Sequence, residues 1–191
     1  ALVCGLFLLP YGNPFLLLGA GVAIALCVPA YTAGPYPLAY RGWGDVCVLL
    51  FYGVIPVCLT YYVQAGTVTA TTAWISVALG LLSVNILLVN NVRDQEQDAA
   101  AGKRTTVVRF GRRFGTTLYL VCAVLAVACS WPAYFYRGAY TWLLFLIFLA
   151  FELVTWHDLR RLSGSDLNRV LGLTARNIWI YTLLLVSLLV F

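Results

Sequence analysis

The sequence is dominated by uncharged apolar segments that are each long enough to cross a lipid bilayer. About 20 apolar residues in a helix span a hydrocarbon core, and in lipid a helix satisfies its backbone groups within one segment. Pro56 is expected to kink the second of these segments. Six full spans are predicted, over 15–33, 46–64, 70–91, 115–136, 140–156 and 171–191, with a partial one over 1–9.

The composition supports this class. The chain is 62% hydrophobic and 10% charged, whereas soluble proteins contain about 25% charged residues. The predicted fold is therefore an all-α, polytopic transmembrane helix bundle that forms a single domain over residues 1–191. No basic patch interleaved with aromatic residues lies outside the apolar segments, which argues against nucleic acid as a partner. The six cysteines are scattered singly and are expected to be packing residues.

The basic residues are distributed unevenly between the two sides of the predicted bundle. Because successive spans alternate in direction, the loops over 34–45, 92–114 and 158–170 are predicted to share one face. The opposite loops offer only Arg137. The positive-inside rule then places the basic face in the cytoplasm. Its basic residues are Arg41, Arg93, Lys103, Arg104, Arg109, Arg112, Arg113, Arg160, Arg161 and Arg169.

The most highly charged of these loops begins with an acidic stretch, residues 90–98, at the end of an apolar span. On a helix, Asn90, Asp94 and Asp98 are spaced i, i+4 and i+8, so their oxygens lie along one face. Such oxygens suit a divalent cation such as Mg²⁺, and the C-terminal end of a helix also favours a cation. The alternative is an interfacial loop whose charges face only water and lipid headgroups. The basic residues that would flank an anion bridged by the metal are Arg93, Lys103 and Arg104.

Together with the run AAGKRT at 100–105, the acidic stretch resembles the second aspartate-rich motif of the UbiA-type intramembrane prenyltransferases. Within that superfamily it is most similar to the 1,4-dihydroxy-2-naphthoate prenyltransferases of menaquinone synthesis. Residues 31–45, YTAGPYPLAYRGWGD, resemble that branch's loop between the fourth and fifth helices. Residues 60–66, TYYVQAG, resemble the end of its fifth helix. The resemblance covers essentially the whole chain, in order.

The resemblance implies an enzyme that transfers a polyprenyl group from polyprenyl diphosphate to 1,4-dihydroxy-2-naphthoate, with Mg²⁺ as cofactor. The products would be demethylmenaquinone, CO₂ and diphosphate. Family members have nine helices and a first Asn/Asp-rich motif between the second and third. This chain begins inside what would be the third helix and contains no Met. It is therefore expected to be cut from a longer protein, to lack the first motif and to be inactive alone.

The family also implies roles for particular residues. Asp94 and Asp98 would be catalytic and would bind the metal with Asn90, while Arg93, Lys103 and Arg104 would bind the diphosphate. The site would lie on the cytoplasmic face of a bacterial inner (plasma) membrane, with lipid around the bundle. Tyr61 and Tyr62 would either contact the prenyl group or belong to an interfacial aromatic belt. Arg41 would either bind the acceptor carboxylate or anchor its loop at the interface.

Two other functions remain open at this point. One is a relative that prenylates a different acceptor, such as 4-hydroxybenzoate, homogentisate, chlorophyllide or haem. The other is a non-catalytic membrane transporter or scaffold whose acidic loop binds a cation. A transporter more often carries ionisable residues at helix midpoints, and here Glu152 is the main such residue. The distribution therefore favours a catalytic site at one membrane face.

Overall fold

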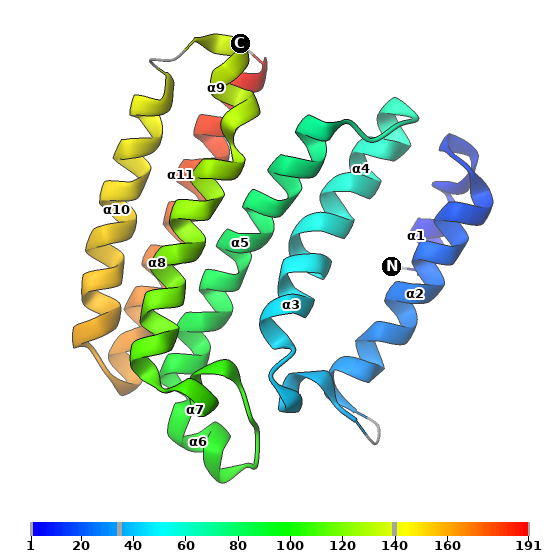
Figure 1. The fold of residues 1–191 in the computed structure, drawn as a ribbon. Helices are drawn as coiled ribbons and strands as arrows, with labels where there is room; N and C mark the ends of the chain where they lie inside the picture. The colour runs from blue at the N-terminus through cyan, green and yellow to red at the C-terminus, as the bar shows by residue number, and fades with distance from the viewer. Residues whose placement is uncertain (1, 34–35, 139–140, 191) are drawn as a thin grey trace.

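The computed structural model describes residues 2–33, 36–138 and 141–190, and this part of the chain is helical, without a β-strand. Its long helices stand side by side and connect at the two ends of the bundle (Figure 1). In chain order the elements are α1 (Leu2–Leu6), η1 (Leu9–Tyr11), α2 (Pro14–Thr32), η2 (Leu38–Arg41), α3 (Gly44–Leu49), η3 (Leu50–Val54), α4 (Ile55–Ala65), α5 (Ala70–Arg93), α6 (Gln95–Ala100), α7 (Thr106–Phe110), α8 (Arg112–Cys129), α9 (Trp131–Arg137), α10 (Trp142–Arg161), η5 (Gly164–Asp166) and α11 (Leu167–Val190).

The six predicted spans are confirmed, because six helical stretches in the described part are long and apolar enough to cross a membrane. Three of them are composite: α3, η3 and α4 run on as one span, and so do α8 with most of α9 and η5 with most of α11. The first predicted segment contains only the short α1 and η1. Several predicted boundaries lie outside the described residues, namely positions 1, 34–35, 140 and 191.

The predicted disruption at Pro56 takes the form of a π-helical turn, η3, directly before the proline. Proline has no N–H to bond the carbonyl four residues back, and its ring would collide with that carbonyl. The helix forms a wider turn instead, in which the N–H of Ile55 bonds the carbonyl of Leu50, five residues back. The span therefore continues through the proline.

The fourth predicted span is divided at Ser130, which has a non-helical backbone conformation. Pro132 follows in the first turn of α9 and cannot donate to the carbonyl of Ala128. Nearby hydroxyl groups supply the missing donors. Ser130 donates to the carbonyl of Ala126 at 2.8 Å, and the hydroxyl of Tyr134 donates to that of Val127 at 2.9 Å. The sequence predicts one helix over 115–136, whereas α8 ends at Cys129 and α9 begins at Trp131.

A close contact between glycines joins α5 to the composite span. A Cβ on Gly53, in the π turn, would lie 2.2 Å from the Cα of Gly80, and a Cβ on Gly80 would lie 2.6 Å from the carbonyl oxygen of Leu49. Real Cβ atoms do not approach other heavy atoms so closely. The two helices therefore touch through their backbones, in the manner of small-residue contacts between transmembrane helices.

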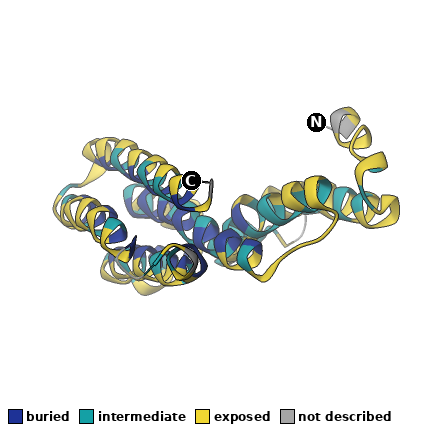
Figure 2. Cartoon of the chain, turned by 90° about the horizontal axis from the view of Figure 1, so that it is seen from above, coloured by how far each residue is buried: buried dark blue, intermediate teal, exposed yellow. Residues whose placement is uncertain are grey.

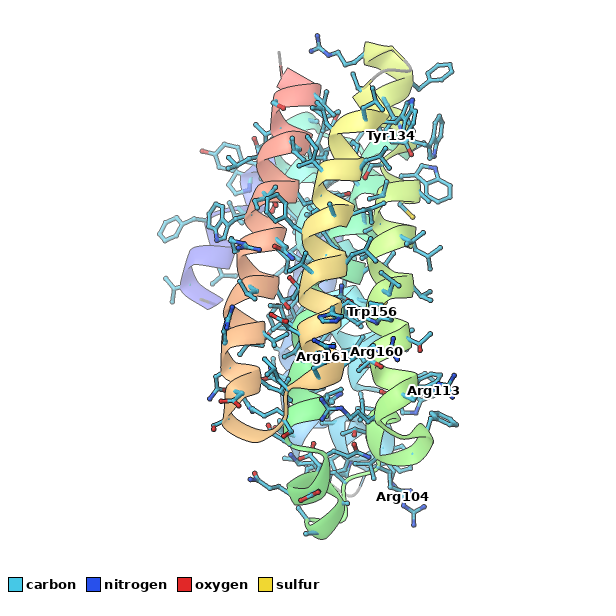
Figure 3. The ribbon with its side chains drawn as sticks, turned by 90° about the vertical axis from the view of Figure 1, so that its left-hand side faces the viewer. Arg104, Arg113, Tyr134, Trp156, Arg160 and Arg161 are labelled. Carbon is cyan, nitrogen blue, oxygen red and sulfur yellow. The ribbon has the colours of Figure 1, made fainter. Side chains whose placement is uncertain are left out.

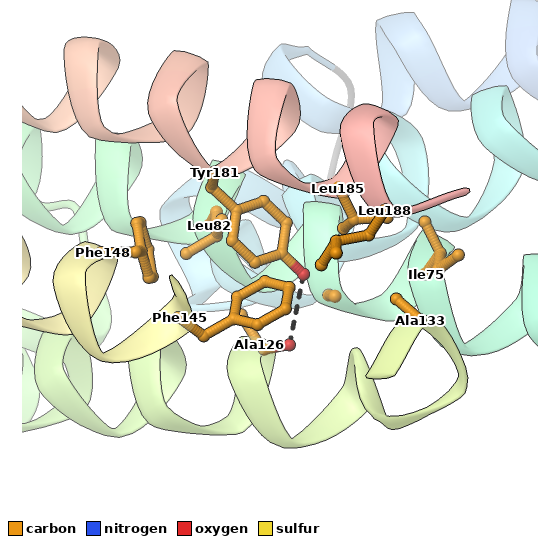
Figure 4. Close-up of a cluster of buried hydrophobic side chains, with 10 residues drawn as sticks. Ile75, Leu82, Ala126, Ala133, Phe145, Phe148, Tyr181, Leu185 and Leu188 are labelled. Atoms are coloured by element: carbon orange, nitrogen blue, oxygen red, sulfur yellow. Dashed lines mark hydrogen bonds between the residues drawn. The ribbon is translucent and has the colours of Figure 1, made fainter. Parts of the chain in front are cut away.

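The core lies where α5, α8, α10 and α11 meet. Figure 2 shows buried residues gathered there, with the N-terminal helices at the other end, and α2 contains no buried residue. Tyr181 packs its ring against Phe145 and Phe148, with centroids 5.7 and 5.1 Å apart (Figure 4). A second cluster, nearer the acidic loop, includes Leu88 and Leu159. Both clusters draw on all four helices, which makes this sub-bundle the rigid support for the rest of the chain.

Fully buried polar side chains lie between α8, α10 and α11. The hydroxyl groups of Tyr119 on α8 and Thr174 on α11 lie 3.1 Å apart, and the Asn177 amide donates to Thr155 on α10 at 2.9 Å. Glu152, the ionisable residue expected in a helix middle, is fully buried on α10 in the same layer. Hydrogen bonds between helices are favoured in lipid because water is not available as a partner.

The basic loops share one end of the bundle, as their alternation predicted. The α2–α3 connection, α6 with α7, and the turn between α10 and α11 all lie at the lower end in Figure 1. Figure 3 shows Arg104, Arg113, Arg160 and Arg161 in the lower half, and Tyr134 near the opposite end. The described part of the loop over 34–45 therefore lies at the same end as the acidic stretch.

Candidate active site

The acidic stretch keeps the predicted helical spacing although its helix is interrupted. Helix α5 ends at Arg93, Asp94 has φ −98° and ψ 11°, and α6 begins at the next residue. The backbone bonds still follow an i to i−4 pattern across the break. The N–H of Asp94 bonds the carbonyl of Asn90 at 2.9 Å, and that of Asp98 bonds the carbonyl of Asp94 at 2.8 Å. Gly102, at φ 74°, then reverses the chain.

A cavity of about 320 Å³ lies between this stretch and the loop that joins α2 to α3. Helices α3 and α5 form its inner wall. Aromatic, amide, carboxylate, ammonium and hydroxyl groups all face it, so it can accept a ligand that is both aromatic and charged. Its lining residues are Tyr31, Thr32, Ala39, Tyr40, Gly42, Gly44, Asp45, Leu87, Asn91, Asp98, Lys103, Thr105 and Thr106.

An ion pair forms one side of this cavity. The carboxylate of Asp98 is buried, and its Oδ1 accepts a hydrogen bond from Lys103 Nζ at 2.7 Å. This hydrogen bond raises the pKa of Lys103, because it stabilises the ammonium form. The ammonium also lies 5.6 Å from the centre of the Tyr40 ring. Asn91, near the start of the acidic stretch and also buried, faces the same cavity from α5.

A second carboxylate, that of Asp45, lines the cavity from the first turn of α3. Its Oδ2 accepts a hydrogen bond from Thr106 Oγ1 at 2.7 Å. Its Oδ1 is buried and has no hydrogen-bond partner among the described residues. A buried carboxylate oxygen without a partner is costly and calls for an explanation.

The sequence model of a protein family described as "UbiA prenyltransferase family" matches residues 1–190. The chain belongs to the UbiA prenyltransferase family. Membership, together with the six apolar helices, identifies it as a multi-pass integral membrane protein. None of the solved structures matches this chain significantly.

Several curated relatives of this UbiA-family chain are named 1,4-dihydroxy-2-naphthoate octaprenyltransferase. The one from Haemophilus influenzae is 35% identical over 75% of this chain and 46% of its own length. The one from Escherichia coli is 40% identical over 58% of this chain and 38% of its own length. A Synechocystis 2-carboxy-1,4-naphthoquinone phytyltransferase is 30% identical over 66% of this chain and 44% of its own length. The chain thus spans less than half the length of these relatives.

In this UbiA-family chain, Asp94 is bound by its neighbour rather than exposed to the cavity. Arg93 donates two hydrogen bonds to the Asp94 carboxylate, both at 2.8 Å, and a third to Asn168 at the start of α11, also at 2.8 Å. The Arg93 guanidinium holds the pKa of Asp94 below its usual value. Within the described residues, Asn90 and Asp94 are not among those that line the cavity. Of the predicted stripe, Asp98 alone does so.

The other predicted contacts lie outside the cavity. The exposed Arg41 stacks its guanidinium 4.1 Å above the Tyr36 ring, and Arg104 is exposed at the lower end of the bundle (Figure 3). Tyr61 and Tyr62 lie near the end of α4, about 25 Å along the composite span from Asp45. The Tyr62 hydroxyl accepts a hydrogen bond from the N–H of Asn13 at 2.9 Å, which ties α4 to the start of α2. The structure therefore does not bring these tyrosines to the cavity.

The donor set fits Mg²⁺ only if a substrate contributes ligands. In the described ranges there is no group of three or more His, Cys, Asp or Glu residues that could hold a metal ion. Mg²⁺ in phosphate-processing sites is commonly held by one or two carboxylates together with substrate phosphates and water. Asp98 and the amide of Asn91 on the cavity wall match that pattern, with Asp94 one helical turn before Asp98.

Two polar residues of the cavity wall were not among the predicted site residues. Asn91 falls inside the acidic stretch but received no role, because helical spacing favoured Asn90. Asp45 belongs to the loop over 31–45 that resembles the family's, and the sequence alone assigns it no role. Its signal was present in the sequence, since Asp45 is a carboxylate at the start of an apolar span, where burial is expensive.

Proposed function

We propose that the protein containing this chain transfers a polyprenyl group from polyprenyl diphosphate to 1,4-dihydroxy-2-naphthoate. The products would be demethylmenaquinone, released as the quinol, with CO₂ and diphosphate. The observation that carries the proposal is the ion pair of Lys103 with the buried Asp98, on the wall of a cavity that also has aromatic walls. The names of the similar proteins support the naphthoate as acceptor.

The acidic stretch would hold Mg²⁺ through Asp98 and Asn91, with Asp94 and Asn90 as further ligands. When bound, Mg²⁺ would neutralise the diphosphate and make it a better leaving group. Asp94 joins this set only if it exchanges its contact with Arg93, so Arg93 is then free to bind an anion. This exchange is consistent with the exposure of about 30% of both side chains, 27% for Arg93 and 32% for Asp94.

Basic residues bind the negative charge of the donor. Lys103 Nζ lies 2.7 Å from Asp98 Oδ1. If Asp98 held the cation, the Lys103 ammonium would be available to bind the diphosphate. Arg104 follows directly at the cavity edge. Charge that develops on the diphosphate as its C–O bond breaks is stabilised by such fixed cations. The prenyl tail lies among the apolar helices, within the lipid-exposed part of the bundle.

The acceptor binds against the aromatic walls formed by Tyr31 and Tyr40. Its electron-rich ring attacks the prenyl carbon as diphosphate leaves, and the new carbon–carbon bond replaces the carboxylate, which departs as CO₂. The aromatic faces also stabilise positive charge on the prenyl group. The basic end of the bundle, which carries the cavity, would face the cytoplasm of a bacterial inner membrane.

The test uses the complete protein in lipid nanodiscs with octaprenyl diphosphate, Mg²⁺ and each acceptor in turn. Mass spectrometry of the product and release of diphosphate are measured together. We expect transfer to 1,4-dihydroxy-2-naphthoate, with loss of activity in Asp98→Asn and retention in the exposed control Glu96→Gln. Transfer to 4-hydroxybenzoate, homogentisate, chlorophyllide or haem instead would assign another acceptor. Cation binding without diphosphate release would point to a transporter or scaffold.

The Synechocystis relative is named for phytyl transfer, so the donor is tested separately. Phytyl diphosphate replaces octaprenyl diphosphate at equal concentration with the same acceptor. A higher kcat/KM with the phytyl donor would revise the donor and leave the acceptor and the site unchanged.

A further inference from the structure

The carboxylate of Asp45 has no function in the metal and diphosphate chemistry described above, yet it faces the same cavity. One of its oxygens is buried without a hydrogen-bond partner in the described part of the chain. The other is fixed by Thr106 Oγ1 at 2.7 Å. The side chain is therefore held in one orientation, with one oxygen left to interact with a ligand.

We infer that Asp45 is the general base that takes a proton from the ring hydroxyl of the aromatic acceptor. The inference rests on the proposed function and specifies how the acceptor is activated. An unionised naphthol is a weaker carbon nucleophile than its oxyanion, and a positioned carboxylate supplies the base that this ionisation needs.

The placement of Asp45 separates it from the cation-binding side. Asp45 and Thr106 come from α3 and α7, whereas Asn91, Asp98 and Lys103 come from α5 and from α6 with the turn that follows it. The aromatic side chains on the cavity wall can hold a planar ring between these two sides. A ring in that position would have its hydroxyl toward Asp45 and its nucleophilic carbon toward the donor.

The atoms and electrons balance in one sequence. The hydroxyl proton passes to Asp45 Oδ1, and the electron pair left on oxygen moves through the ring to form the new carbon–carbon bond. The C–O bond of the donor breaks, and its electron pair leaves on diphosphate. The ring carbon now carries both the prenyl group and the carboxylate beside a ketone, so CO₂ departs. The resulting enolate takes the proton back from Asp45, which completes the cycle.

A structural role is the alternative, because an acidic residue in the first turn of a helix also stabilises the helix dipole. A residue that only stabilised the helix would accept hydrogen bonds from the free backbone N–H groups of that turn. The unpartnered, buried Oδ1 favours the catalytic role instead. The titratable groups around it are those of the same cavity and one thiol of α8, namely Tyr31, Tyr40, Asp98, Lys103 and Cys122.

The test compares Asp45→Asn with the wild type in the complete protein, using whichever phenolic acceptor the wild type accepts. We expect kcat to fall by about 10²-fold or more, as for the loss of a general base. KM for the prenyl diphosphate and Mn²⁺ affinity, measured by electron paramagnetic resonance, should stay within about threefold of the wild type. The acid limb of the kcat–pH profile should disappear in the variant.

Two further measurements exclude a purely structural effect. Acceptors whose hydroxyl group is made more acidic by ring substituents should reduce the defect of Asp45→Asn progressively. Formate should partly restore turnover in Asp45→Ala. An equal loss with every acceptor, a kcat above half the wild-type value, or a defect confined to Mn²⁺ binding would each refute the inference. A wild type that transfers to no aromatic acceptor would instead refute the proposed function.

Discussion

A methyl group on Gly53 would lie 2.2 Å from the Cα of Gly80, so the π turn before Pro56 and the middle of α5 meet with no room for a side chain. This contact positions α3, and with it Asp45, against the helix that carries Asn91 and leads into the acidic stretch. The cavity therefore depends on two glycines that are far apart in the sequence and lie side by side in space.

Gly53→Ala should destabilise the protein by about 1–3 kcal/mol, because the added methyl group must displace backbone. Fluorescence-detected thermal unfolding of the complete protein would show a lowered midpoint. Gly21→Ala is the matched control, since Gly21 is also in a helix and a Cβ there meets nothing within 4 Å. An unchanged midpoint in Gly53→Ala would contradict the close approach.

Asp98→Asn should lower kcat/KM for the prenyl diphosphate on the order of 10²-fold or more, because it removes the charge proposed to bind the cation. Mn²⁺ affinity should fall in parallel, which electron paramagnetic resonance titration measures. Glu96→Gln removes an exposed carboxylate from the same short helix and should change neither quantity. Equal losses in both variants would show that only the total charge of the loop matters.

Thr106→Val keeps the volume of the side chain and removes the hydrogen bond to Asp45 Oδ2. A hydrogen bond to a charged group contributes about 1.5–3 kcal/mol, so kcat should fall by about 10-fold or more while Mn²⁺ affinity is retained. Thr117→Val, at an exposed position, is the control. Wild-type kinetics in Thr106→Val would mean that Asp45 is positioned by other contacts.

The Arg93–Asp94 pair should contribute a pH-dependent part of the stability. The pKa of Asp94 is lowered from its ordinary value of 3.8, first by the hydrogen bonds from Arg93. A lowered folded-state pKa means that the stabilisation is fully present above about pH 4 and is lost as the pH falls through the folded value. Thermal midpoints from pH 7 to pH 3 should therefore drop more in the wild type than in Asp94→Asn. Parallel curves would show that the pair contributes nothing.

Arg112→Met should destabilise the end of α10. The Arg112 guanidinium donates to the carbonyl of Leu159 at 2.7 Å and also to that of Leu162. The last carbonyls of a helix have no partner within the helix, so removing this donor should cost about 1–3 kcal/mol. Hydrogen exchange should increase around residues 158–162. Arg113→Met, at an exposed neighbour, should leave that exchange unchanged.

The features that depend on local sequence were predicted well. Apolar segments of about 20 residues predicted all six spans, because in lipid such a segment has few alternatives to a helix. Helical spacing also predicted the i to i−4 backbone bonds that run from Asn90 through Asp94 to Asp98. Alternation of the spans correctly grouped the basic loops at one end of the bundle.

The features that depend on distant partners were not predicted. Thr106 bonds Asp45 across 61 positions of sequence, and Arg93 bonds Asn168 across 75. Helical spacing could not show that Arg93 would engage Asp94, nor that Asn91 rather than Asn90 would face the cavity. Those outcomes are decided by how α3, α5 and α11 pack, and a single sequence contains no direct record of that packing.

The backbone ties between the two loops at the cavity end have a consequence for access. The N–H of Arg104 bonds the carbonyl of Tyr40 at 2.9 Å, and Arg109 Nη2 bonds the carbonyl of Arg41 at 2.8 Å. These bonds join the α2–α3 connection to the segment that carries Arg104 and Arg109, so that the two form one continuous floor of the cavity and neither can move away alone. A substrate with a long hydrocarbon tail would then slide in laterally from the bilayer, and its charged head would come to rest on the inner surface of that floor.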